Sequence, residues 1–324
     1  MKDILADIEK RSIEKKKTVV LPETNDARVI EAAERIVEKE SSKLIFISEN
    51  EKLEKYFSDH PSIQFMSWNR ETDKELCIEL ILSNLRHKSI SVSEAENMLS
   101  DPLIYAGALV ALNRADAAVA GSVATTASVI RSGLYTVGVK PNSKLVSSIF
   151  LMSLTNGKTI SYSDCAVVPY PDSQQLASIA IDAGNSHHIL TGEIPKIAFL
   201  SFSTKGSAKH EKVDLVRKAV EIANSKSPGW IIDGELQFDT AYVPEIASKK
   251  APDSPIGGSA NVFIFPNLDA GNIAYKITER VAGARATGPI LQGFNKPYLD
   301  LSRGCSTADI VSSIHVASVL SDSA

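Results

Sequence analysis

The sequence has few of the residues that mark secreted, metal-binding or membrane proteins. It contains only 3 cysteines, and Cys77, Cys165 and Cys305 are widely spaced without a CxxC pair. This pattern fits neither a disulfide framework nor a zinc site. No apolar run reaches the roughly 18 residues of a membrane span, and acidic residues occupy the N-terminal stretch that a signal peptide would keep apolar. We therefore expect a soluble, cytoplasmic protein with no metal and no membrane partner.

An excess of positive charge is also missing. The formal net charge is -4 at pH 7 and the pI is about 5.9. Because general nucleic-acid binders are usually basic, we expect no nucleic-acid partner, and any anion site must be local. What the chain does have is 44% hydrophobic residues in a length of 324. This is enough for about two domains with buried cores.

The apolar pattern indicates an α/β fold. Apolar, β-branched runs alternate with helical patterns, which is typical of parallel sheets. Strands are expected at 18–22, 43–47, 63–68, 115–120, 147–154, 159–164, 196–203, 230–238 and 260–266, and helices at 26–39, 71–86, 94–113, 173–185, 212–224, 240–248 and 271–282. The Asn156-Gly157 pair predicts an antiparallel hairpin between 147–154 and 159–164. The Pro141-Asn142-Ser143 stretch predicts a domain boundary after residue 143.

The strongest candidate for chemistry is the segment 298–309, where a strand is expected to give way to a helix. Open α/β sheets place ligands at such junctions. Arg303 offers a planar fork for phosphate or carboxylate, Ser302 can donate to a developing oxyanion, and Asp309 supplies a carboxylate. A structural interpretation is also open, because Ser306 and Asp309 fit the capping-box start of a helix over 307–320. Spacing alone does not decide between them.

Five segments of the second half of the chain are distinctive. They are FLSFSTKGSAK at 199–209, KKAPDS at 249–254, VFIFPNLDAGN at 262–272, GPILQG at 288–293 and LDLSRGC at 299–305. In this order they resemble the phosphate acetyltransferase family, and the resemblance runs from about Thr18 to the C-terminus. The resemblance implies reversible acetyl transfer, in which acetyl-CoA and phosphate give acetyl phosphate and CoA without an acyl-enzyme. It implies that Asp309 deprotonates the CoA thiol, that Arg303 neutralises the phosphoryl group and that Ser302 stabilises the oxyanion.

The resemblance also implies that Arg86, Arg131 and Arg280 bind phosphate groups of CoA or free phosphate. Cys305 raises the alternative of a covalent mechanism, but no histidine lies nearby in sequence to activate it, so we expect it to line the pocket. Ser132 stands where relatives commonly have proline, which predicts a looser turn after Arg131.

The family further implies two three-layer α/β domains with largely parallel sheets and an active-site cleft between them. The chain would return to the first domain near residue 297, which gives 1–143 plus 298–324 and 144–297. A homodimer is implied, with CoA and phosphate as substrates and no other cofactor. The alternatives are a phosphate butyryltransferase, or a non-catalytic protein that binds CoA or acetyl phosphate.

Overall fold

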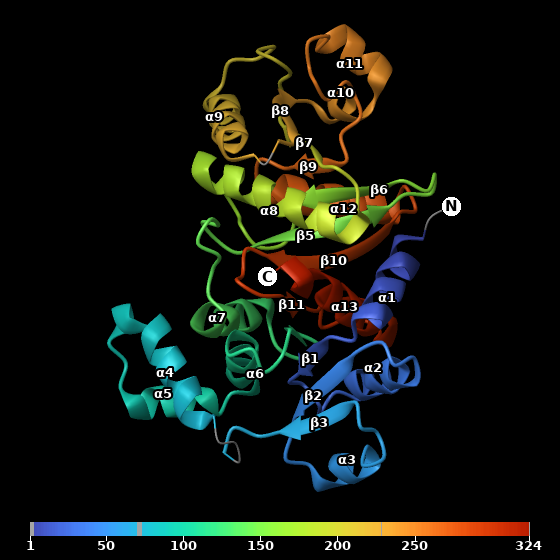
Figure 1. Cartoon of the computed structure of the whole chain (residues 1–324). Helices are drawn as coiled ribbons and strands as arrows, with labels where there is room; N and C mark the ends of the chain where they lie inside the picture. The colour runs from blue at the N-terminus through green and yellow to red at the C-terminus, as the bar shows by residue number, and fades with distance from the viewer. Residues whose placement is uncertain (1–2, 70–72, 228, 324) are drawn as a thin grey trace. The chain divides into compact units, whose positions relative to one another are not determined.

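The computed structural model describes residues 3–69, 73–227 and 229–323, and the chain divides into two compact units (Figure 1). The split unit comprises Leu5–Val139 and Phe294–Ala324, and the central unit comprises Lys140–Gly293 together with the N-terminal residues up to Ile4. This division reflects how densely residues contact one another, and it does not show that either unit folds independently as a domain. The domain limits 1–143 plus 298–324 and 144–297 therefore stay a prediction.

The split unit is built on a five-stranded sheet in the order β11-β4-β1-β2-β3. The strands are β1 (Thr18–Leu21), β2 (Lys43–Ile47), β3 (Ile63–Met66), β4 (Ala117–Ala120) and β11 (Tyr298–Asp300). Every neighbouring pair is parallel. All five carboxyl ends therefore lie at the same edge of the sheet, which is where such sheets bind ligands.

Helices flank this sheet. Every residue of β4 is buried, which requires cover on both of its faces, and α6 and α13 both contact β1 and β4. The helices are α1 (Ile4–Lys15), α2 (Ala27–Glu38), α3 (Glu51–Tyr56), α4 (Lys74–Asn84), η1 (Arg86–Lys88), α5 (Val92–Leu99), α6 (Pro102–Ala111), α7 (Thr126–Thr136), α13 (Thr307–Leu320) and η2 (Ser321–Ser323). The expected helix over 307–320 is confirmed.

Two of the helix predictions are wrong because each spans a proline. The expected helix over 94–113 is two helices, since Asp101 accepts a hydrogen bond from the Leu103 N–H as N-cap and Pro102 opens α6. The expected helix over 240–248 is likewise divided into α10 (Phe238–Tyr242) and α11 (Pro244–Lys250). The expected helix over 71–86 begins outside the described residues, and α4 ends at Asn84.

The central unit holds a six-stranded sheet in the order β10-β5-β6-β9-β7-β8. β5 pairs antiparallel with β6 and β10, and the remaining pairs are parallel, so the predicted hairpin and a mixed, largely parallel α/β architecture are confirmed. The strands are β5 (Ser147–Ser153), β6 (Thr159–Ser163), β7 (Lys196–Leu200), β8 (Ile231–Leu236), β9 (Val262–Ile264) and β10 (Arg285–Gln292). The sequence analysis did not anticipate β10.

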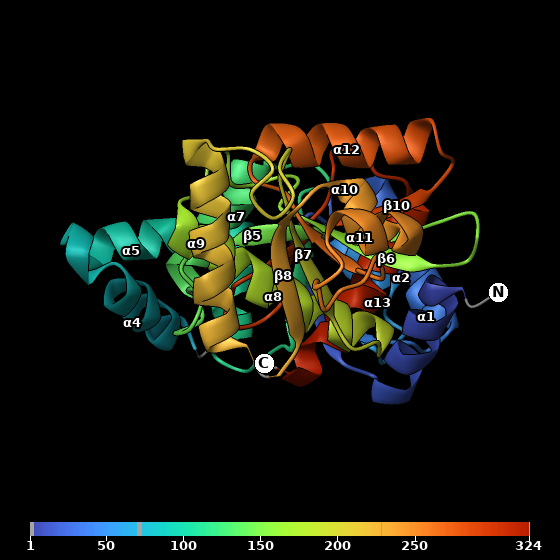
Figure 2. The ribbon, with the colours of Figure 1, turned by 90° about the horizontal axis from the view of Figure 1, so that it is seen from above.

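The helices of the central unit cover both faces of its sheet. Successive residues of a strand point to opposite faces. Ser161 Oγ is hydrogen-bonded to His187 of α8 (Ser173–Thr191), whereas the Tyr162 hydroxyl is hydrogen-bonded to Thr278 of α12 (Leu268–Arg280). α8 and α12 therefore lie on opposite faces, and Figure 2 shows α12 running along one of them. α9 (Glu211–Lys226) packs beside α8.

Among the described residues, no helix is both long enough and apolar enough to cross a membrane.

Close packing of α8 on this sheet requires a glycine. A Cβ at Gly184 would lie 2.8 Å from Trp230 Cε3 and 2.9 Å from Ile197 Cδ1. Gly184→Ala gains about 0.5–1 kcal/mol of helix propensity, but overpacking costs about 1–3 kcal/mol. We expect a net loss of about 1–2 kcal/mol in the free energy of unfolding, measured by denaturant titration. The exposed neighbour Asn185→Ala is the matched control and should be neutral or slightly stabilising. Equal stability of the two variants would contradict this packing argument.

Candidate active site

Glu23 joins the loop after β1 to the loop after β4. Its Oε2 accepts hydrogen bonds from the N–H groups of Gly121 and Ser122, both at 2.7 Å, and its Oε1 accepts from Val123 at 3.1 Å and Ala124 at 2.7 Å. Gly121 has φ +102, a conformation that other residues rarely adopt. Consecutive N–H groups of this kind form an anion-binding concavity. Here the protein's own carboxylate occupies it and fixes the loop before α7.

Asp300 joins the end of β11 to the start of α7. Its Oδ2 accepts a hydrogen bond of 2.6 Å from Thr126 Oγ1. Its Oδ1 is buried without a hydrogen-bond partner among the described residues, and the side chain lies in the space beside Gly121 that a Cβ would need. Desolvation raises the pKa of Asp300 from 3.8 to about 6, and the nearby charge of Glu23 adds to the rise.

The loop after β11 carries the residues on which the sequence analysis concentrated. Ser302 and Arg303 are exposed, and Ser302 Oγ accepts a hydrogen bond of 3.2 Å from the Gly304 N–H. Ser306 is the N-cap of α13 and forms the predicted capping box with Asp309. Asp309 Oδ2 accepts from the Ser306 N–H at 2.9 Å and from Ser306 Oγ at 2.8 Å. Among the described residues only Oδ2 of this exposed carboxylate takes hydrogen bonds, which leaves Oδ1 for a ligand.

Cys305 is nearly enclosed, with 8% of its surface exposed. Burial raises the pKa of its thiol, and Arg28, whose Nη1 lies 3.7 Å from the sulfur, lowers it. The cation that faces this sulfur is therefore Arg28 and not its sequence neighbour Arg303. A buried thiol with a raised pKa is a poor nucleophile, which does not favour the covalent alternative.

Arg131 lies within a continuous α7, exposed on the same helix whose first residue contacts Asp300. The expected loose turn after Arg131 is wrong: the Ser132 hydroxyl donates to the Ser128 carbonyl at 2.9 Å and is accommodated inside the helix. Within the described parts of the chain, neither Arg131 nor Arg303 forms an ion pair. Both guanidinium groups are therefore available to an anionic ligand.

Arg86 lies at the other end of α7. Asn84 Nδ2 donates to the carbonyls of Tyr135 at 3.1 Å and Thr136 at 2.7 Å, which fixes the α4–η1 junction beside the last turn of α7. An eleven-residue helix places this end about 15 Å from Thr126. The exposed Arg86 is thus held near the C-terminus of α7 and not near its N-terminus.

Arg280 belongs to the central unit, at the end of α12. Its side chain is 79% exposed and lies 3.3 Å from the carboxylate of Glu279. The structure thus brings together Ser302, Arg303, Cys305 and Asp309 within one loop and helix start, with α7 adjacent to them. Arg280 is not part of that group within the split unit.

Three residues of this edge were missed by the sequence analysis: Glu23, Arg28 and Asp300. Glu23 lies two residues beyond the end of β1, and Asp300 is the last residue of β11. The rule that ligand sites gather at the carboxyl ends of strands was therefore a usable signal for both. Nothing in the local sequence identified Arg28.

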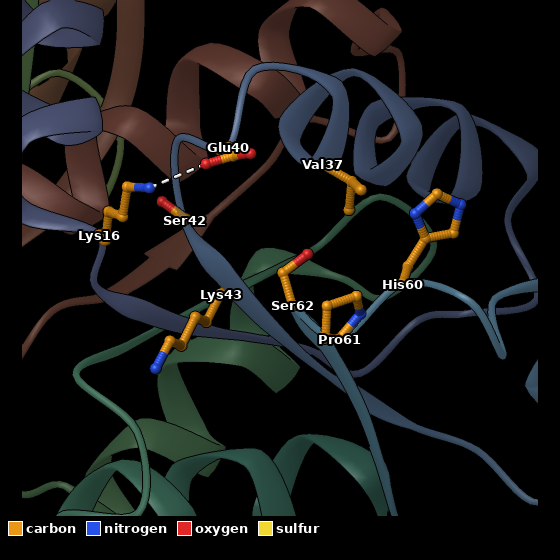
Figure 3. A pocket seen from close by; sticks show the side chains of 8 residues that line it. All are labelled: Lys16, Val37, Glu40, Ser42, Lys43, His60, Pro61 and Ser62. Atoms are coloured by element: carbon orange, nitrogen blue, oxygen red, sulfur yellow. Dashed lines mark hydrogen bonds and ion pairs between the residues drawn. The ribbon is translucent and has the colours of Figure 1, made fainter.

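A pocket of about 450 Å³ lies instead at the amino ends of β1, β2 and β3. It is lined by Lys16, Val37, Glu40, Ser42, Lys43, His60, Pro61 and Ser62 (Figure 3). Lys16 is paired with Glu40 at 2.9 Å, and the amine of Lys43 points away from His60 and Ser62. Its polar groups do not converge on one point. Among the described residues no group of three His, Cys, Asp or Glu side chains is placed to hold a metal ion.

The split unit is a parallel α/β sheet whose carboxyl edge carries exposed arginines that form no ion pair among the described residues. The profile of the family described as Phosphate acetyl/butaryl transferase matches residues 3–318, and the chain belongs to this family. It is 43% identical over 303 residues to the phosphate acetyltransferase of Acetivibrio thermocellus, covering 91% of each chain. It is 40% identical to that of Treponema pallidum, covering 97% of this chain and 98% of the relative.

A solved structure agrees with these relatives. The phosphotransacetylase of Streptococcus pyogenes superposes with a TM-score of 0.93 at 36% identity, covering 99% of this chain and 98% of that one. The resemblance inferred from the sequence is confirmed, and with it the expectation of an enzyme of the acyltransferase class.

The raised pKa of Asp300 makes a testable contribution to stability. A carboxyl group whose pKa is about 6 in the folded protein and 3.8 unfolded stabilises the fold below about pH 4, and this contribution is lost as the pH rises through 6. Its size is at most about 3 kcal/mol. The thermal midpoint of the wild type relative to Asp300→Asn should therefore fall between pH 4 and pH 6.5. Parallel curves for the two proteins over this range would show that Asp300 does not titrate as described.

Proposed function

We propose that this chain catalyses the reversible transfer of an acetyl group between CoA and inorganic phosphate. The proposal is supported most by one observation: the exposed hydroxyl of Ser302, the exposed guanidinium of Arg303 and the carboxylate of Asp309 stand within one loop and helix start. Among the described residues, that guanidinium forms no ion pair and one oxygen of that carboxylate accepts no hydrogen bond. The relatives named phosphate acetyltransferase favour the acetyl group. A protein that only bound CoA or acetyl phosphate would not need a base beside the hydroxyl and the guanidinium.

The transfer is direct, from CoA sulfur to phosphate oxygen or the reverse. When the enzyme forms acetyl-CoA, Oδ1 of Asp309 takes the proton of the CoA thiol. The thiol needs this base because a free thiol, with a pKa of about 8.5, is largely un-ionised at neutral pH. Arg303 neutralises the phosphoryl group and polarises the carbonyl, and the Ser302 hydroxyl donates to the tetrahedral oxyanion. In the reverse direction Asp309 returns the proton to the leaving thiolate.

The remaining predicted residues bind the substrates. Arg131 in α7 and Arg86 in η1 are exposed and bind phosphate groups of CoA or free phosphate. Arg280 does so from the central unit. Cys305, nearly buried within the same loop, lines the pocket. CoA and phosphate are substrates, no further cofactor takes part, and the enzyme works in the cytoplasm as a homodimer.

A second candidate is a phosphate butyryltransferase, because the family description includes both activities. Phosphate-dependent release of CoA from acetyl-, propionyl- and butyryl-CoA separates the two. We expect acetyl-CoA to have the highest kcat/KM, since each methylene in a fitted pocket changes kcat/KM by about 10- to 200-fold. A preference for butyryl-CoA would replace the acetyl assignment, and no turnover of any of the three would favour a binding protein.

The proposed base is tested by Asp309→Asn. Asparagine keeps an oxygen that accepts the cap hydrogen bonds but cannot take a proton, so kcat should fall about 10²- to 10⁴-fold with little change in the thermal midpoint. The matched control is Ser306→Ala, which removes the cap hydroxyl and leaves the carboxylate. It should cost about 0.5–2 kcal/mol of stability and reduce kcat far less. A kcat near the wild-type value in Asp309→Asn would refute the catalytic role.

A further inference from the structure

Arg28 uses only part of its guanidinium in its local ion pair. It lies in the first turn of α2, and Asp26 is the N-cap of that helix. Nε donates to Asp26 Oδ1 at 3.1 Å, and Nη2 donates to Oδ2 at 2.6 Å. A guanidinium carries five N–H donors in a fixed plane, so donors remain beyond those that hold a single carboxylate.

The other donors of Arg28 reach two more loops. Nη2 also donates to the carbonyl of Ser122 at 2.9 Å, in the loop after β4. Nη1 donates to the carbonyls of Arg303 at 3.0 Å and Cys305 at 2.6 Å, in the loop after β11. One side chain thus links the segments that follow β1, β4 and β11, and it does so through backbone atoms.

The first of the two carbonyls in the β11 loop belongs to the peptide plane that joins Arg303 to Gly304. A trans peptide is planar, and its C=O and N–H point in opposite directions. Arg28 holds the C=O side of this plane, and the N–H on the other side is the Gly304 N–H that donates to Ser302 Oγ. Fixing the carbonyl therefore fixes the direction from which the Ser302 hydroxyl is held.

The second carbonyl has the same relation to Asp309. The peptide plane that joins Cys305 to Ser306 presents its C=O to Arg28. Its N–H is the Ser306 N–H that donates to Asp309 Oδ2 at 2.9 Å. The two planes held by Arg28 are thus the two whose N–H groups hold the hydroxyl and the carboxylate of the proposed reaction.

We propose that Arg28 is a positioning residue for the acyl transfer: by holding two carbonyls of the β11 loop it sets the orientation of Ser302 and Asp309. The inference rests on the proposed function. Arg28 does not itself touch the reacting atoms. A lysine cannot replace it, because a point charge cannot address Asp26 and several carbonyls in one plane.

The first test measures kcat, KM and the thermal midpoint of Arg28→Met and Arg28→Lys. The matched control is Arg114→Met, because Arg114 is also paired with a mostly buried aspartate, Asp73, but precedes β4 and so lies at the opposite edge of the same sheet. We expect kcat to fall about 10- to 100-fold in both Arg28 variants, as for small displacements of reacting groups, and to stay within about twofold in the control. A kcat within twofold of wild type in Arg28→Lys would overturn the proposal.

A double-mutant cycle distinguishes positioning from general loosening. If Arg28 acts through Ser302, then Arg28→Met combined with Ser302→Ala should be about as slow as the slower single variant. If the two losses multiply, the cycle is repeated with Asp309→Asn, because Arg28 also holds the peptide plane whose N–H donates to Asp309. Losses that multiply with both Ser302→Ala and Asp309→Asn mean that Arg28 acts by another route, and the proposal then fails. Should Arg28→Met lose its cooperative thermal transition, the cycle is carried out with Arg28→Lys, which retains the positive charge beside Asp26.

A structural readout separates this inference from the proposed function. Amide hydrogen exchange of the peptide that spans residues 303–306 should accelerate about tenfold or more in Arg28→Met and not in Arg114→Met. This measurement needs no turnover. If the wild-type protein does not turn over acetyl-CoA but Arg28→Met shows the faster exchange, the proposed function is refuted and the holding of the β11 loop by Arg28 is supported. If exchange is unchanged in Arg28→Met, the role of Arg28 is refuted even in an active enzyme.

Discussion

The parallel order of β11, β4 and β1 is the constraint on which the candidate site depends. Parallel neighbours deliver their carboxyl ends to one edge, so the segments that follow them meet there although Arg28 and Cys305 are 277 positions apart. Glu23 and Arg28 then hold the loops after β4 and β11 in place, mainly by hydrogen bonds to backbone N–H and C=O groups. Because these contacts use the main chain, the side chains of Ser302 and Arg303 stay exposed for a ligand.

The charges at this edge are divided between those satisfied internally and those left open. Glu23 is held by backbone N–H groups and Asp26 by Arg28, whereas Arg303 and Arg131 form no ion pair among the described residues. A chain with net charge -4 can thus present a local site for anions. Asp309 takes part in both kinds of interaction, because its Oδ2 completes the cap of α13 while its Oδ1 accepts no hydrogen bond from the part of the chain that the structure describes. The cap and the proposed base are therefore compatible.

Much of the fold was predictable because its strands, turns and helix starts depend on residues that are close together in the sequence. Alternating apolar runs gave most strands, the Asn156-Gly157 pair gave the hairpin, and Ser306 with Asp309 gave the start of α13. The helices divided at Pro102 and Pro244 were predictable too, since proline favours the first turn of a helix and not its interior. The sequence analysis nevertheless predicted one helix across each proline, because it gave the helical apolar pattern more weight than the single proline.

The sequence by itself determined the family, the α/β class and the cluster of Ser302, Arg303 and Asp309, because these depend on neighbours a few positions apart. Only the tertiary structure showed that Glu23 and Arg28 hold the loops of the candidate site together. Apart from Asp26, which pairs with Arg28, their partners lie from 94 to 277 positions away and are mainly backbone atoms, which carry no residue-specific signal. A contact between a side chain and a distant main chain can be recognised only once the strands have been brought to one edge.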